Sequence, residues 1–530
     1  MLVPINEAGK IGIVSVSDRP PHELPLNAWT AGENVRFRDG MVEKFLGHAA
    51  PFGNPTVAPY FLMPARNGTV RLWLYAGLAK VYTTDGTTHY NITRQTTSAT
   101  DIDYSATVVR NWTGGALGLI PVINNGIDVP QFWQPSAPTQ ILQDLTNWPA
   151  STTASALRVF RRYLVALDVI KSGTRYPQMV KWSSPAPSGG VPATWDPSDE
   201  TNDAGEYEIV SSSGDCLDLA PMRDQAVIYK EDSVHWMQHV GGVEIFSFPP
   251  MFDSFGALSR RCAVEYARGR HIVLALGDLI AHDGQQWDSV VSGRMRRWMF
   301  QQMDPDFYQT SFIALHPAKY EAWACFPSIG NQIPNLALVW NWRYGTCGVR
   351  ELPGVAHAHA GEVFFPDTGD IWDSDSGVWD SDASSWGEAA ADPAGLRMLM
   401  ADAVNTRLLA ADFTNQYAGA NMTAFVERVG MPLPVKPDGP PDMRSRKFIK
   451  DLWPRVLGTD GQQIQVYIGG QDAVDAPVTW QDPVSFTIGT TDHIPVRLNT
   501  RLLAIRFQSN TDLEWRIPGY EIDVVPAGRF

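Results

Sequence analysis

Two pairs of closely spaced histidines are the residues whose type and spacing come nearest to a metal site. His235 and His239 are four residues apart, with Glu231 just before them. On a helix this spacing would bring both rings to one metal ion, but the surrounding residues have the pattern of a strand. His357 and His359 share one face of an extended segment, and the sequence offers no evident third ligand. We therefore predict no metal site at either pair.

Carboxylates and known catalytic motifs give no stronger candidate for a catalytic site. The segment from Asp373 through Asp375 to Gly377 begins like a calcium loop, but it lacks the third acid and the closing glutamate. Motifs of the forms G-x-S-x-G, G-x-x-x-x-G-K-[ST] and H-E-x-x-H are absent from the sequence. Acids are numerous, yet no pattern selects one pair for glycoside hydrolysis. The sequence therefore predicts a protein that is not an enzyme and has no cofactor.

The composition indicates how such residues would be positioned. A chain of 530 residues is too long for one compact core, so two to four domains are expected. Aromatic residues make up 11% of the chain, and 44 Gly and 39 Pro supply many turns, which together favour short strands over long helices. The four cysteines are far apart and form no C-x-x-C pair. This argues against a disulfide framework or a zinc site and suits synthesis in a reducing cytoplasm.

The charge balance and the lengths of the apolar runs limit how the chain can interact with nucleic acid and with membranes. The net charge is −15. Binding to nucleic acid through its phosphates needs clustered Lys and Arg, so an acidic chain is not expected to bind in this way. Such a surface is nevertheless compatible with a conduit along which DNA slides without sticking. We expect no membrane-spanning segment and no secretion signal, because no apolar run approaches 18 residues and the N-terminus lacks a cationic leader. The basic residues fall into three local clusters, which we interpret as solvated strand ends or ion-pair partners. The clusters are Arg158 with Arg161 and Arg162, Arg294 with Arg296 and Arg297, and Arg444 with Arg446, Lys447 and Lys450.

The middle of the chain, residues 51–400, repeats a short apolar strand, a tight turn and an aromatic strand. Residues 72–92 and 275–290 share a strand, a Gly, a second strand and an Asp-Gly turn followed by an aromatic residue. The repetition favours an irregular β-propeller, with inserted loops at 183–215 and 370–388. A large β-sandwich or two stacked β domains is the alternative. Further strand pairs are expected at 226–237, 157–169 and 320–342.

The two ends of the chain differ from this repeat. Residues 1–50 predict an extension with a hairpin, whose strands flank an Asp-Gly turn. Residues 401–443 contain two segments, 407–413 and 422–429, that we expect to pair, followed by a Pro- and Gly-rich linker. Residues 444–530 alternate apolar and polar positions and predict a C-terminal β-sandwich-like module. The predicted fold class is therefore mainly β.

Several strings in the chain go beyond these general patterns. Residues 24–47 read LPLNAWTAGENVRFRDGMVEKFLG, and residues 116–133 contain Asn-Gly-x-Asp-x-Pro. Residues 320–352 contain E-x-W and P-N-x-A-L-V-W-N, and residues 447–530 contain KFIKDLWPR and WRIPGYEIDVVPAGR. These strings resemble the tail nozzle proteins of short-tailed bacteriophages, also called tail tubular or packaged-DNA-stabilising proteins. Residues 183–215 match nothing in that family.

The resemblance implies a structural component of a short phage tail, located in the virion and, during assembly, in the host cytoplasm. Such proteins carry a β-propeller and assemble as a hexameric ring beneath the portal and its adaptor ring, where they continue the DNA channel and anchor tail fibres or spikes. Double-stranded DNA would touch the channel transiently and without sequence preference. The family has no enzymatic mechanism, so no catalytic residue is carried over. Two acidic loops are candidates for the lumen or tip on charge alone: Asp196, Asp199, Glu200, Asp203, Asp373, Asp375, Asp380 and Asp382.

Two other functional hypotheses remain. The first is a glycan-binding or glycan-degrading propeller of a phage tail, because aromatic-rich loops can stack on sugar rings. The second is a solitary propeller that binds proteins and forms no ring. Subunit interfaces cannot be recognised in one sequence, so the residues alone do not separate a ring from a monomer.

Overall fold

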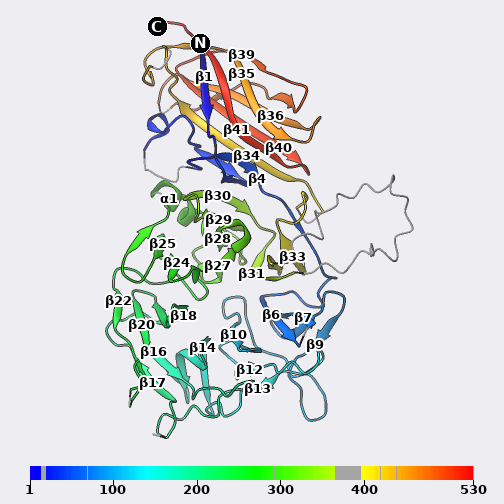
Figure 1. The fold of residues 1–530 in the computed structure, drawn as a ribbon, viewed down its shortest axis with the longest axis vertical. Helices are drawn as coiled ribbons and strands as arrows, with labels where there is room; N and C mark the ends of the chain where they lie inside the picture. The colour runs from blue at the N-terminus through cyan, green and yellow to red at the C-terminus, as the bar shows by residue number, and fades with distance from the viewer. Residues whose placement is uncertain are drawn as a thin grey trace, which may run out of the picture.

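The structure of the chain is a computed structural model. It describes residues 1–13, 19–68, 70–199, 201–242, 244–291, 293–363, 396–417, 419–436, 439–474 and 476–528. The described residues form two β modules, which lie one above the other in Figure 1. Seven small antiparallel sheets make the lower module and two six-stranded sheets make the upper one. The predicted mainly-β fold class, with a propeller, an N-terminal hairpin extension and a C-terminal sandwich-like module, is thereby confirmed.

The lower module is a seven-bladed β-propeller within the described residues. We number the blades 1 to 7 in chain order. Blade 1 contains β6 (Phe61–Asn67), β7 (Val70–Ala76), β8 (Val81–Thr84) and β9 (His89–Asn91); blade 2 contains β10 (Thr113–Leu117), β11 (Ile120–Asn124), β12 (Gln131–Phe132) and β13 (Gln143–Asp144). Blade 3 contains β14 (Thr152–Phe160), β15 (Tyr163–Lys171), β16 (Thr174–Trp182) and β17 (Gly205–Glu208). Blade 4 contains β18 (Cys216–Met222), β19 (Gln225–Lys230), β20 (Val234–His239), β21 (Phe246–Ser247) and β22 (Pro250–Phe252).

The remaining blades complete the ring. Blade 5 contains β23 (Ala263–Ala267), β24 (Arg270–Ala275), β25 (Asp278–His282) and β26 (Trp287–Ser289); blade 6 contains β27 (Phe312–His316), β28 (Glu321–Phe326), β29 (Leu336–Asn341) and β30 (Thr346–Glu351). Blade 7 contains β31 (Val355–Glu362), β32 (Leu396–Asp402) and β33 (Arg407–Ala411), and its fourth strand is β5 (His48–Ala49) from the N-terminal part of the chain. The ring is therefore closed by hydrogen bonds between segments more than 350 residues apart, through the pairs Ala410↔Ala49 and Ala411↔His48.

The first strand of each blade lies against the first strand of the next, from β6 round to β31 and back to β6. These strands surround the axis of the ring (Figure 1). Most apolar clusters of the propeller draw buried residues from two adjacent blades, such as blades 1 and 2, 2 and 3, or 3 and 4. A single blade cannot bury both faces alone, which explains why the repeated strand pattern requires a closed ring.

The upper module is a β-sandwich made by both ends of the chain. Its first sheet runs β3 (Val35–Arg38), β4 (Met41–Lys44), β41 (Trp515–Pro526), β35 (Lys447–Gly458) and β39 (Ile494–Thr500), with β1 (Leu2–Asn6) also paired to β41. Its second sheet runs β2 (Ala31–Glu33), β34 (Met422–Met431), β40 (Leu502–Thr511), β36 (Gln463–Gln471) and β37 (Thr479–Trp480), with β38 (Val484–Thr487) paired to β36. The alternating apolar residues of these strands face inward and are buried, as period-two alternation requires.

One predicted pairing is wrong. The segments 407–413 and 422–429 do not pair with each other. Instead β33 pairs with β32 and β5, while β34 pairs with β40 and β2. The physical reason is that β34 has ten residues with one alternating buried face, which the sandwich can cover, whereas β33 is paired on both sides within blade 7, by β32 and by β5.

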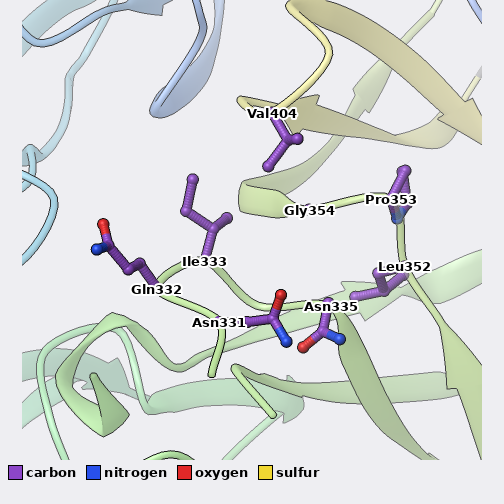
Figure 2. A pocket seen from close by; sticks show the side chains of 8 residues that line it. All are labelled: Asn331, Gln332, Ile333, Asn335, Leu352, Pro353, Gly354 and Val404. Atoms are coloured by element: carbon purple, nitrogen blue, oxygen red, sulfur yellow. The ribbon is translucent and has the colours of Figure 1, made fainter. Parts of the chain in front are cut away.

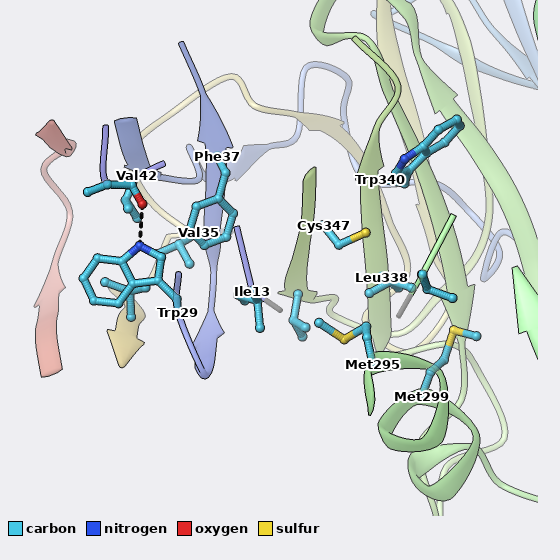
Figure 3. Packing of buried hydrophobic residues seen from close by; sticks show 14 of the residues in the cluster. Ile13, Trp29, Val35, Phe37, Val42, Met295, Met299, Leu338, Trp340 and Cys347 are labelled. Atoms are coloured by element: carbon cyan, nitrogen blue, oxygen red, sulfur yellow. Dashed lines mark hydrogen bonds between the residues drawn. The ribbon is translucent and has the colours of Figure 1, made fainter. Parts of the chain in front are cut away.

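Helical structure is limited to α1 (Gly293–Gln302) and the short 3-10 turns η1 (Pro21–Glu23), η2 (Tyr308–Thr310) and η3 (Pro317–Lys319) in the part of the chain that is described. Within that part, none of the helices is long and apolar enough to span a membrane. The buried face of α1 carries Met295 and Met299. These side chains join a cluster that also includes Leu338 of blade 6 and Val35 of the sandwich (Figure 3). One continuous apolar core therefore connects the two modules.

Candidate functional site

The junction between the two modules is formed by β3 of the sandwich and β30, the outermost strand of blade 6. The backbone N–H of Asn34 donates to the carbonyl of Val349 at 2.8 Å, and the backbone N–H of Glu351 donates to Asn34 Oδ1 at 3.0 Å. A Cβ on Gly348 would lie 2.5 Å from the carbonyl oxygen of Val35, so the close approach requires glycine there. The junction is thus a specific fit between two backbones.

The predicted hairpin supplies this fit. Asp39 and Gly40 have φ values of 52° and 75°, the left-handed conformations that a two-residue hairpin turn needs. The strands flank this turn in the register Val35↔Lys44 to Arg38↔Met41. The arginine of β3 nearest the junction, Arg36, is buried, because that face of the hairpin packs onto the propeller.

A buried ion network lies beneath this contact. Arg36 donates from Nη2 to Asp412 Oδ2, and Arg350 donates from Nη1 to Asp412 Oδ1 at 2.8 Å. The Nε of Arg36 also lies 3.4 Å from Glu321 Oε1. We call Arg36, Arg350, Asp412 and Glu321 the junction network. Its members come from the sandwich, blade 6 and the residue after β33 of blade 7, so it connects three parts of the fold.

The electrostatics of the junction network centre on one carboxylate. Burial alone would raise the pKa of Asp412, but the Arg36 and Arg350 guanidiniums outweigh it and hold that pKa well below its usual range. Burial raises the pKa of Glu321, although Arg36 opposes the shift. Arg350 also donates from Nη2 to the Leu46 carbonyl at 2.7 Å and to His48 Nδ1 at 3.0 Å. The network therefore reaches the strand β5 that closes the ring.

Two neutral histidines next to this network should make the fold sensitive to acid. Burial lowers the pKa of His316 to about 4 and the pKa of His48 well below 6.5. The unfolded chain, with histidine near 6.5, therefore binds these protons more tightly than the fold does. Stability from this source is present above about pH 6.5 and is lost as the pH falls toward 4.

We expect His316→Gln to reduce the loss of stability between pH 6.5 and 4 by up to about 3 kcal/mol. Chemical unfolding at several pH values in this window measures the slope, and the exposed His493→Gln is the matched control. Because other buried histidines remain, the free energy of unfolding of this variant should still fall with pH, but less steeply than in the wild type. An unchanged slope in His316→Gln would show that this ring does not take up the proton.

A hollow of about 420 Å³ lies where loops of blades 6 and 7 meet. In Figure 2, Ile333 and Val404 point toward the same space from the two blades. A Cβ on Gly354 would meet Val404 Cγ2 at 2.5 Å, so this wall is also tightly packed. The described residues that line the hollow are amides, aliphatic residues, Pro and Gly, with neither a carboxylate nor an aromatic ring among them. The hollow offers hydrogen bonds but no acid, base or stacking surface.

The predicted acidic loops are only partly within the described residues. Asp196, Asp199 and Asp203 lie in the connection between β16 and β17, the two outer strands of blade 3, and so on the periphery of the propeller. Asp196 accepts from the backbone of Ser198 at 2.9 Å, and Asp203 accepts from Tyr163 Oη at 3.0 Å. These acids do not converge on a common point. The others lie outside the described residues: Glu200, Asp373, Asp375, Asp380 and Asp382.

The structure also shows where the histidines of the two predicted pairs lie. His235 is buried on β20 with Nε2 3.2 Å from Ser233 Oγ, whereas His239 at the end of that strand is exposed. His357 accepts at Nδ1 from the backbone of Leu62 at 3.1 Å and so joins blade 7 to blade 1. Among the described residues no group of three His, Cys, Asp or Glu could hold a metal ion.

Comparisons with known proteins give only distant similarities. No family model and no curated protein matches the chain. The chain is similar to an extracellular domain described as that of a one-component system from B. thetaiotaomicron, with 9% identity and a TM-score of 0.38 over 84% of this chain and 47% of that one. It is also similar to BamB from Moraxella catarrhalis, with 9% identity and a TM-score of 0.28 over 57% of this chain and 77% of that one. A glycoside hydrolase matches at 10% identity and a TM-score of 0.24, over 89% of this chain and 100% of that one. The chain spans about half the length of the first of these structures.

Proposed function

We propose that this chain is a structural component of a short phage tail, a ring-forming nozzle that continues the DNA channel below the portal and adaptor. In this role it retains packaged DNA and passes it during ejection. The proposal rests on the resemblance of four segments of the sequence to the nozzle family and on where these segments lie in the fold.

The observation that carries the proposal is that most of the resembling strings meet in space. The string at 24–47 forms β3 and β4, and the strings at 447–530 form β35 and β41. These four strands are consecutive neighbours in one sheet, although they come from opposite ends of the chain. The string at 320–352 forms β28, β29 and β30 of blade 6, and β3 docks onto β30. A likeness that maps onto one contiguous unit is more informative than scattered matches.

The junction network suits a subunit that transmits load within a ring. A ring of six copies closes through a heterologous interface, in which each subunit presents two different surfaces. Such a ring keeps its geometry only if each subunit behaves as one rigid body. The shared apolar core and the buried network between sandwich and propeller support that rigidity.

One surface feature favours the glycan-binding alternative. Tyr320 is 43% exposed and lies 6.0 Å, centroid to centroid, from Trp342, which in turn lies 5.6 Å from Tyr266. Tyr320 and Trp342 meet edge to face, with an angle of 84° between their planes, so the exposed ring of Tyr320 is the surface on which a sugar ring can stack. In the nozzle proposal the same rings would contact a protein partner, such as a fibre or spike.

DNA retention tests the proposed function. DNA-filled capsids that carry portal and adaptor but lack this chain should release DNA, and adding the purified chain should slow that release at least tenfold. The readout is the fraction of DNA accessible to nuclease, with capsids that lack the adaptor as the control. If release is unchanged while the isolated chain binds or cleaves host polysaccharide, the glycan-binding alternative replaces the proposal.

A further inference from the structure

Arginine side chains gather where the inner strands surround the axis of the propeller. Arg260 and Arg261 end the loop that leads into β23 of blade 5, and both are half-buried. Arg260 donates to the Ser155 carbonyl of blade 3 at 2.7 Å and to the Val109 carbonyl, just before blade 2, at 3.1 Å. A side chain of blade 5 that reaches blades 2 and 3 must cross the ring near its axis.

Arg261 is held beside it by its backbone. Its N–H donates to Asp218 Oδ2 at 2.7 Å, and its carbonyl accepts from the Ile313 N–H at 2.8 Å. The residue has a φ of 66°, a left-handed conformation that is uncommon for residues other than glycine. Its guanidinium lies 5.7 Å from the Phe312 ring and 3.4 Å from the Ala356 carbonyl. Neither contact supplies a negative charge.

The nearby acid is already neutralised. Asp218 accepts from Arg158 Nε at 2.6 Å and from Arg158 Nη2 at 3.1 Å, which makes a bidentate pair. The next acid, Asp168, is paired in the same way with Arg175 at 2.8 and 2.9 Å. Arg260 and Arg261 therefore have no carboxylate partner among the described residues.

The other charged and titratable groups nearby do not change this balance. Arg110 adds a further positive charge, and His357 is held neutral because burial lowers its pKa. Burial, together with repulsion from Arg110, lowers the pKa of Arg260 to about 10. Burial, together with repulsion from Arg260, lowers the pKa of Arg261 to about 10, so both remain charged at neutral pH. Two half-buried guanidiniums that have no carboxylate of their own are unfavourable unless an anion joins them.

We propose that Arg260 and Arg261 form a binding site for a small oxyanion at the axis of the propeller. The fork geometry of guanidinium suits phosphate, sulfate or a carboxylate, which present paired oxygens. The site lies apart from the junction network and does not depend on the proposed tail function. A bound anion would tie blade 5 to the opposite blades and so stabilise the ring.

Titration calorimetry of the full chain with inorganic phosphate, at constant ionic strength in sodium chloride, tests this site. We expect one phosphate per chain and a thermal midpoint that rises with phosphate concentration, as binding to the folded state requires. Parallel titrations with sulfate and acetate distinguish the oxyanions. Arg261→Gln should weaken phosphate binding at least tenfold, whereas Arg268→Gln, an exposed change at the far end of β23, should leave it unchanged.

Circular dichroism verifies that each variant is folded, and Arg260→Gln replaces Arg261→Gln if that variant is not. Absence of any phosphate-specific heat or thermal shift relative to chloride would overturn the proposal. Equal phosphate affinity in the wild type and in the folded arginine variant would overturn it as well.

Discussion

Asp412→Asn is expected to lower the free energy of unfolding by about 3–5 kcal/mol. The substitution preserves the shape of the side chain but removes the only carboxylate that bridges Arg36 and Arg350 among the described residues. Both guanidiniums then remain buried, with Glu321 as the nearest negative charge, 3.4 Å from Arg36 Nε. Removing one partner from a buried network is strongly destabilising because the remaining charges lose their compensation.

Thermal unfolding and urea unfolding followed by tryptophan fluorescence measure this effect. The exposed Asp253→Asn is the matched control and should shift stability by no more than about 0.5 kcal/mol. Because the junction network links sandwich and propeller, we also expect the variant to unfold in two separable steps. A single transition at the wild-type position would contradict the role of this network.

Gly47→Ala is expected to open the closure of the propeller and to destabilise the chain by about 3 kcal/mol or more, at or beyond the upper end of the usual range for overpacking. A Cβ at this position would lie 1.8 Å from the carbonyl oxygen of Gln416, a backbone atom that cannot rotate away. The backbone here is fixed by hydrogen bonds from Gly47 N to Thr414 O at 2.5 Å and from His48 N to Gln416 O at 2.9 Å. Relief of the clash must therefore break the pairing that brings β5 to blade 7.

Hydrogen exchange of β5 and β33, together with the thermal midpoint, tests this prediction. Gly53→Ala is the matched control, because its nearest neighbour would be His89 Nε2 at 3.7 Å, an ordinary contact. Faster exchange in β5 and β33 of Gly47→Ala alone is the expected result. Wild-type exchange in both variants would mean that the chain accommodates the methyl group elsewhere.

The local patterns of the sequence predict much of the fold. The Asp39-Gly40 turn, the alternation in β36, β40 and β41, and the strand pairs of the propeller are encoded within a few residues of each other. The error at 407–429 has the opposite origin. β33 takes β5 as its second partner beside β32, and β34 pairs with β40 and β2. Because β5, β40 and β2 lie far away in the sequence, the adjacent strands in the chain offered a simpler but incorrect pairing.

The junction network cannot be recognised in one sequence for the same reason. Arg36 and Asp412 are hydrogen-bonded although 376 residues separate them, and one sequence carries no signal for that contact. Arg36 lies on a hairpin that the sequence does predict, but its burial depends on blade 6. Arg260 and Arg261 are equally inconspicuous, because only the closed ring brings them opposite blades 2 and 3.

The particle mass and shape of the purified chain, alone and mixed with portal-adaptor particles, test the central claim most directly. Mass photometry gives the number of copies, and negative-stain imaging shows whether they enclose a channel. The tail nozzle account predicts a closed ring of six around a central opening, formed at least on contact with the adaptor. A chain that stays monomeric and ignores the adaptor would contradict it.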